Sequence, residues 1–105
     1  MNATTTIDGA NALISLHGDI DYDTLPGLLD AAAQLPETVT AVTWDLHGVP
    51  FMDVAAIHLL SDRRGGRTVT VTGLGAQPQR LIRMASNLFP GLFEDPHPAG
   101  AEHTL

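Results

Sequence analysis

Carboxylate side chains crowd one short segment of the chain. Asp19, Asp21 and Asp23 occupy alternate positions there, and oxygen ligands of this kind suit Mg²⁺ or Ca²⁺. However, the segment lacks the following Gly and the distal Glu of a calcium-binding loop. Carboxylates are also common just before a helix, where they complement the partial positive charge of its N-terminus. We therefore predict no metal at this segment.

Two histidines occupy matching Leu-His-Gly steps, each at the end of an expected strand. If these strand ends lie side by side, the imidazoles of His17 and His47 approach each other and can bind a metal or respond to pH. Two histidines provide only half of a zinc ligand set. We predict two side chains at loop edges without a ligand, and keep a small ligand or metal sensor as a further alternative.

Nucleophilic and nucleotide chemistry has little support in the sequence. The chain contains no Cys, and its serines (Ser15, Ser61 and Ser86) stand in no Gly-x-Ser-x-Gly motif. The sequence indicates no Asp or His partner for any of them. Gly73-x-Gly75 is too short for a dinucleotide-binding fingerprint, and no Gly-Lys-Ser/Thr phosphate loop is present. We predict that the protein is not an enzyme and has no cofactor.

The elements that position these residues follow from hydrophobic spacing. Two strand-like runs, Thr4–Ile7 and Ala12–His17, flank Asp8-Gly9 and predict a β-hairpin, because Gly accepts the positive φ of such a turn. The rest of the chain predicts, in order, a helix from Asp23-Thr24 to Pro36, a strand over Val39–Leu46, a helix over Val54–Arg64, a strand over Arg67–Thr72 and a helix from Pro78 to Phe89. The order β-β-α-β-α-β-α predicts an α/β fold, a mixed β-sheet with an N-terminal hairpin covered by about three helices.

Two helices carry more specific predictions. Asp53 is expected to cap the N-terminus of the middle helix, and Arg63 and Arg64 fall in its last turn, where cations favour the helix dipole. The buried side of the last helix is predicted to consist of Leu81, Ile82, Met84, Ala85, Leu88 and Phe89.

Length and charge limit the possible functions. With 105 residues and a mass of 11.1 kDa, the chain fits a single domain, which we place at residues 1–93, followed by a flexible C-terminal tail at 94–105. The net charge is −7 and all five basic residues are Arg, so the chain repels phosphate backbones and anionic lipid. We expect no nucleic acid and no membrane insertion. Without a signal peptide at the start, a cytoplasmic protein is expected.

Three segments in this order resemble the STAS domain, the family of anti-sigma-factor antagonists. They are Leu16–Asp21, Trp44–Val49 and Phe51–Ala56. The family patterns read Gly-acid-apolar-Asp, then Asp-Leu-x-Gly-Val, then Phe-x-Asp-Ser-Ser-Gly, and the resemblance covers about residues 4–93. It implies a bacterial partner-switching module in transcription regulation, which acts by binding a kinase-type anti-sigma factor or a related ATPase.

The chain departs from this family at the position that carries regulation. In the family, the kinase phosphorylates the Ser directly after the motif Asp, which adds about −1.5 to −2 charge and breaks the complex. That Ser falls on Val54 here, and Ala55 and Ala56 replace the next Ser and Gly. The resemblance therefore implies an antagonist without the usual phosphorylation site. The predicted middle helix is also shorter than is usual in the family.

The expected partner surface lies before two of the helices. The middle helix is more apolar than one buried face requires, which favours an interface with a partner or a second copy as a homodimer. The residues predicted to bind the partner are Asp21, Tyr22, Asp23, Asp53, Val54, Ala55, Ile57 and His58. The main alternative is a STAS subunit that regulates the ATPase of a lipid-transport ABC complex.

Overall fold

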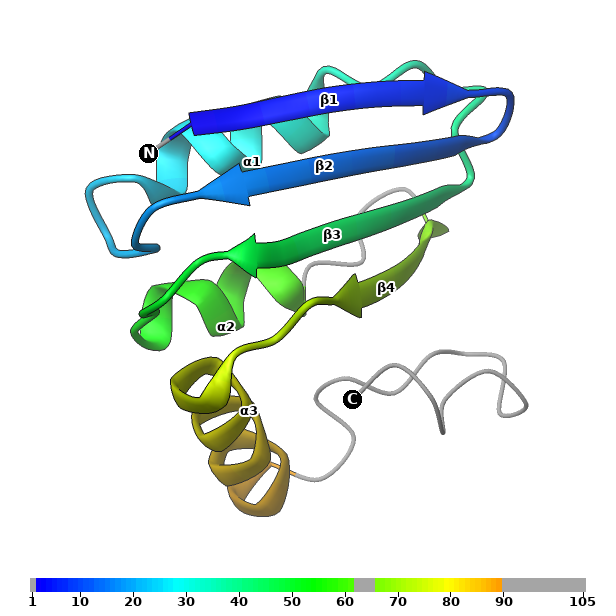
Figure 1. The fold of residues 1–105 in the computed structure, drawn as a ribbon. Coiled ribbons are helices and arrows are strands. Elements are labelled where there is room, and N and C mark those ends of the chain that lie inside the picture. The colour runs from blue at the N-terminus through cyan, green and yellow to red at the C-terminus, as the bar shows by residue number, and fades with distance from the viewer. Residues whose placement is uncertain (1, 62–65, 90–105) are drawn as a thin grey trace.

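The computed structural model describes residues 2–61 and 66–89 (Figure 1). The elements follow the predicted order: β1 (Asn2–Asp8), β2 (Asn11–His17), α1 (Leu25–Ala33), β3 (Ala41–Gly48), α2 (Val54–Leu60), β4 (Thr68–Thr72) and α3 (Ala76–Leu88). None of the helices within these ranges is long and apolar enough to cross a membrane.

The strands form a mixed sheet in the order β1-β2-β3-β4. β1 and β2 are antiparallel, and Gly9 sits in their turn with a φ of 61°, which favours glycine. β2, β3 and β4 are parallel, so their carboxyl ends meet at one edge of the sheet (left in Figure 1). The N-terminal hairpin and the α/β fold class are therefore confirmed.

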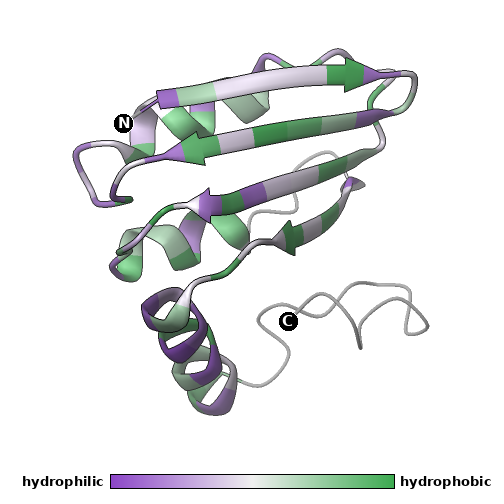
Figure 2. Ribbon diagram, viewed as in Figure 1, coloured by the Kyte–Doolittle hydropathy of each residue, from purple (hydrophilic) through white to green (hydrophobic). Residues whose placement is uncertain are grey.

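The two faces of the sheet differ in what covers them. Helices α1 and α2 lie behind the sheet in Figure 1 and bury one face. This covered face consists of Ala12, Ile14, Leu16, Val42, Trp44, Leu46, Val69 and Val71, all buried. The alternate residues form the opposite, open face, which no element within the described ranges covers: Leu13, Ser15, Thr43, Asp45 and Thr70. Figure 2 shows the alternation as bands along β3 and β4.

Two helix ends differ from the prediction. α1 ends at Ala33, before the predicted stop at Pro36, and Arg67 donates hydrogen bonds to the carbonyl groups of Ala32, Leu35 and Pro36 around this end. α2 ends at Leu60, where the Ser61 hydroxyl donates to the Ile57 carbonyl at 2.6 Å. The predicted last turn with Arg63 and Arg64 lies outside the described residues, as do the tail at 94–105 and the end of the predicted domain.

The predicted buried side of α3 is only partly right. Ile82 and Ala85 are buried, but Met84, Leu88 and Phe89 are 53%, 66% and 62% exposed. Figure 1 shows that α3 extends away from the edge of the sheet beside β4, and that no other helix or strand within the described ranges lies beside its last turn. The spacing of apolar residues along a helix predicts which side of it is buried, but not how far along the helix a packing partner extends.

Candidate functional site

Two loops at the C-terminal ends of the parallel strands are hydrogen-bonded to each other. The loop after β2 and the loop after β3 run side by side, because the Ile20 N–H donates to the Phe51 carbonyl at 3.2 Å and the Asp53 N–H donates to the Ile20 carbonyl at 3.1 Å. Ile20 and Met52 point into the core and are fully buried. The two hydrogen bonds and the two buried side chains fix the position of the segment before α1 relative to the segment before α2.

The segment before α1 forms a turn that two reciprocal hydrogen bonds close, while Thr24, the N-cap residue of α1, makes no side-chain bond to the helix itself. The Thr24 N–H donates to Asp21 Oδ1 at 3.0 Å, and the Asp21 N–H donates to Thr24 Oγ1 at 3.0 Å. This is the arrangement of a capping box, in which two side chains satisfy two unpaired backbone donors. Tyr22 and Asp23 lie between these residues and project outward, with Tyr22 59% exposed. The Asp21 carboxylate and N–H therefore bond within the turn that exposes Tyr22.

The start of α2 confirms the predicted cap at Asp53. Its Oδ1 accepts a hydrogen bond from the Ala55 N–H at 2.8 Å. Val54 is the next residue and is 57% exposed, and His58 is exposed one turn later.

Burial corrects two of the predicted contact residues. Ala55 is fully buried and Ile57 is only 9% exposed, so neither side chain is available to a partner. The physical reason is that α2 lies beside α1 and α3 and buries most of its side chains in the same core as the strands. Within α2, only Val54 and His58, which are one turn apart, are exposed.

Phe51 is an exposed residue of this surface that the sequence analysis did not assign to it. It is 47% exposed and immediately precedes the buried Met52. The side-chain amide of Gln77, on α3, holds Met52 at both backbone groups: Gln77 Oε1 accepts from the Met52 N–H at 3.0 Å, and Nε2 donates to the Met52 carbonyl at 3.0 Å. The signal for Phe51 was its place in the Phe-x-Asp motif, directly after a turn.

We call this surface the docking edge; its exposed members are Tyr22, Asp23, Phe51, Val54 and His58. Its apolar side chains stand among carboxylates, and the segments 18–24 and 49–58 contain no Lys or Arg. The surface can therefore offer apolar contact inside a negative rim. Within the described ranges, no group of three or more His, Asp or Glu side chains can hold a metal ion.

The two histidines do come together at the ends of β2 and β3. The His17 and His47 ring centroids lie 5.8 Å apart in an edge-on arrangement. Gly48 makes room for them, because a Cβ there would collide with His17 Nδ1 and lie 2.9 Å from the Leu16 carbonyl oxygen. The pairing depends on neighbouring strands, as the sequence analysis required.

Asp45 connects the open face of the sheet to this histidine pair. Its carboxylate accepts from the Ser15 hydroxyl at 3.2 Å and contacts His47 Nδ1 at 3.0 Å. The hydrogen bonds from His47 lower the pKa of Asp45. The sequence indicated no such partner for Ser15, which lies 30 residues away from Asp45. The hydroxyl donates to a carboxylate and not to the imidazole, so Ser15 and His47 do not form a nucleophile and base pair.

Comparisons with known proteins agree on one kind of fold. Residues 3–86 match the family described as "Mlab, STAS domain". The unphosphorylated anti-sigma factor antagonist SpoIIAA has a TM-score of 0.71 at 15% identity, covering 88% of this chain and 83% of its own. An anti-sigma factor antagonist from Mycobacterium paratuberculosis has a TM-score of 0.64 at 22% identity, covering 85% and 82%.

A further solved structure, the phosphorylated Bacillus cell fate determinant SpoIIAA, has a TM-score of 0.56 at 18% identity, covering 85% of this chain and 84% of its own. No curated protein sequence matches the chain. At these identities the solved structures establish the fold, and they confirm the predicted mixed sheet with its helices.

Proposed function

The chain belongs to the STAS domain family, and from that premise we propose that it is a non-catalytic interaction module of the anti-sigma-factor-antagonist kind. Its partner in this proposal is a kinase-type anti-sigma factor in the bacterial cytoplasm, and its role is transcription regulation. Solved structures with the same fold carry the name anti-sigma factor antagonist, which supports this kind of function.

The docking edge is the observation that carries the proposal. Tyr22, Phe51 and Val54 expose apolar surface from two loops that are bonded to each other and anchored in the core. A rigid base lowers the entropy cost of binding, and aromatic side chains commonly act as anchors in protein interfaces. The surrounding carboxylates would steer a partner with a basic surface.

Val54 decides how the interaction is regulated in this proposal. It occupies the position that the family resemblance assigns to the phosphorylated Ser, directly after the Asp53 cap. Its side chain is exposed but has no hydroxyl, so a kinase partner would bind it without transferring phosphate. The protein would then act as an antagonist that stays in its unphosphorylated state.

The test restores the missing hydroxyl. The Val54→Ser variant, incubated with the anti-sigma kinase and ATP, should gain one phosphate and then lose the complex, whereas the natural chain and Val54→Ala should gain none. Intact mass and co-elution measure both effects. If Val54→Ser takes up no phosphate and no complex forms with any of the three proteins, the proposal is wrong.

The partner itself is identified by affinity purification from the native host with mass spectrometry. Tyr22→Ala and Phe51→Ala should each lose the recovered partner. Met84→Ala is the matched control, because Met84 is also an exposed apolar residue, at 53%, but lies on α3 outside the docking edge. Equal recovery with all three variants would show that the docking edge is not the interface.

A second candidate uses the same surface with a different ATPase. The matching family is described by Mlab and STAS domain and not by sigma-factor control, which leaves room for a STAS subunit that regulates a lipid-transport ABC ATPase. Recovery of a transporter ATPase in place of an anti-sigma kinase would select this candidate.

A third candidate is a metal sensor at the histidine pair. The observation in its favour is the 5.8 Å separation of the His17 and His47 rings, with Asp45 at His47 Nδ1 and Nε2 of the same ring left for a ligand. Zn²⁺ should then raise the melting temperature of the natural chain but not of the His17→Ala, His47→Ala double variant. Equal melting temperatures with and without Zn²⁺ would remove this candidate.

A further inference from the structure

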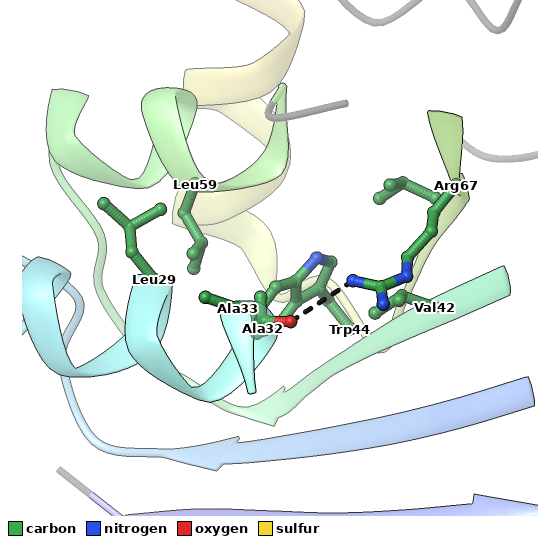
Figure 3. A pocket seen from close by; sticks show the side chains of 8 residues that line it. Leu29, Ala32, Ala33, Val42, Trp44, Leu59 and Arg67 are labelled. Carbon is green, nitrogen blue, oxygen red and sulfur yellow. Dashed lines mark hydrogen bonds between the residues drawn. The ribbon is translucent and has the colours of Figure 1, made fainter. Parts of the chain in front are cut away.

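A cavity of about 80 Å³ lies between α1, α2 and the covered face of the sheet (Figure 3). Apolar side chains from all three elements form most of its wall, among them Leu29, Ala33, Val42 and Leu59. It lies behind the sheet, apart from the residues of the docking edge, and so needs an explanation of its own.

The indole of Trp44 gives this apolar cavity a hydrogen-bond donor without an acceptor. Trp44 is only 3% exposed, and among residues 2–61 and 66–89 no group accepts a hydrogen bond from its Nε1. Figure 3 shows the indole nitrogen on the side of the ring that faces the cavity and Arg67. Buried donors are nearly always paired, so an unpaired one marks a place where a ligand or a water belongs.

Arg67 adds a positive charge to the wall of the same cavity. Its guanidinium donates only to backbone carbonyls: those of Val39 at 2.8 Å, Ala32 at 3.3 Å, Leu35 at 3.2 Å and Pro36 at 3.0 Å. These four bonds leave one of the five N–H donors of an arginine unused, at Nη1. No carboxylate within the described ranges pairs with this charge.

We propose that this cavity is a binding site for a small monocarboxylate with a short apolar chain. The Trp44 N–H needs an acceptor, and the half-buried Arg67 guanidinium beside it, which has no carboxylate partner within the described ranges, favours an acceptor that carries a negative charge. The remaining wall is apolar and excludes a polar chain. A cavity of about 150 Å³ holds a benzene molecule, so one about half as large holds an apolar chain of about three carbons, with the carboxylate at the end formed by the half-exposed Arg67.

The carboxylate lies beside Arg67 and Trp44 Nε1 in this proposal, and its chain extends toward Leu29 and Leu59. Such a ligand bridges α1, α2 and the sheet from a position that the partner does not occupy. The inference is independent of the identity of any protein partner.

The single Trp of the chain makes a direct test possible, because ¹⁵N-labelled protein has one indole N–H resonance. Sodium isobutyrate is titrated against the full chain at constant ionic strength, with sodium chloride as the balance. The expected result is a saturable downfield shift of that resonance, with half-saturation at about 1 mM for a ligand of this size. Acetate, which lacks the chain, and isobutyramide, which lacks the charge, should each bind at least about tenfold more weakly.

Two variants test the location. Ala32→Leu enlarges a partly buried side chain in the wall of the cavity and should abolish the shift, whereas Ala31→Leu, which is next to it but outside the lining, should retain it. Trp44→Phe keeps an aromatic ring but removes the donor, and should weaken isobutyrate binding at least about tenfold by calorimetry. The amide spectrum of each variant verifies that it is folded.

Four outcomes would overturn the proposal. If the indole resonance does not move with isobutyrate, a buried water is the only occupant. If isobutyrate and isobutyramide bind equally, Arg67 has no role in binding. If the shift survives in folded Ala32→Leu, or if Trp44→Phe binds as tightly as the natural chain, the anion binds elsewhere.

Discussion

The covered and open faces of the sheet are built from the same strands but are stabilised differently. On the covered face, Trp44 and its neighbours are stabilised by burial and by close apolar packing under α1 and α2. On the open face, Thr43 and Asp45 occupy alternate positions of β3, and the Asp45 carboxylate accepts a hydrogen bond from the Ser15 hydroxyl of β2. Alternation along a strand assigns each residue to a face, but the helices decide which face becomes the core.

The largest difference is expected between neighbouring residues of β3. Trp44→Ala should lower the free energy of unfolding by about 3–5 kcal/mol, because it removes a buried aromatic side chain and enlarges the cavity beside it. Thr43→Ala on the open face should cost about 1 kcal/mol or less. Urea denaturation measures both. Equal costs would mean that the open face is also packed against something.

Substitution of Gly48 tests whether close packing also constrains the strand ends, where Gly48 lies against His17. Gly48→Ala should cost about 1–3 kcal/mol in the free energy of unfolding, because its Cβ would collide with His17 Nδ1. The cost should fall in a His17→Ala background, although the Leu16 carbonyl remains close. Gly27→Ala is the control: nothing lies within 4 Å of that position in α1, so it should stabilise the protein by about 0.5–1 kcal/mol. Additive effects of Gly48→Ala and His17→Ala would contradict this account.

Gln77 tests how the docking edge depends on the core beneath it. Gln77→Ala should cost about 1–3 kcal/mol, because it leaves both backbone groups of the buried Met52 without their partner. Hydrogen exchange at residues 51–53 should accelerate in this variant. Gln79→Ala, which removes one exposed hydrogen bond to the Leu74 carbonyl, is the control and should have a smaller effect on both measurements.

The smallest effect is expected on the open face, at Asp45, and it depends on pH. The folded protein holds the pKa of Asp45 below its usual value through hydrogen bonds from His47, so ionised Asp45 stabilises the fold. This stabilisation is present above the unfolded pKa of about 3.9 and is lost as the pH falls through the lower folded value. Asp45→Asn should remove it, and should cost about 1 kcal/mol or less at pH 7, because His47 is 68% exposed.

Denaturation of Asp45→Asn and the natural chain between pH 7 and pH 2 provides the measurement. The two stabilities should converge as the pH falls through the folded pKa of Asp45. A difference that stays constant down to pH 2 would assign the effect to something other than the charge of Asp45.

Short-range features were the ones that the sequence predicted well. The hairpin at Gly9 and the cap at Asp53 each depend on residues within a few positions of each other, and both were predicted correctly. Tyr22 and Val54 are exposed, as a contact surface requires, and their role in partner binding stays a prediction; Phe51, which is also exposed, was not among the predicted residues. The prediction failed for Ala55 and Ile57, whose burial depends on elements that pack around α2.

The amino-acid sequence by itself therefore determined the order of elements, the alternation along each strand and the absence of a hydroxyl at Val54. Local periodicity and capping encode the order of elements and the alternation, because both depend on spacings along the chain. The missing hydroxyl is a property of the residue type at position 54. Only the tertiary structure decided that Ser15 meets Asp45 and that the exposed end of α3 lies beyond the sheet. It also decided that Arg67 and Trp44 share one cavity. Such contacts join residues far apart in sequence, and their geometry depends on how the layers pack.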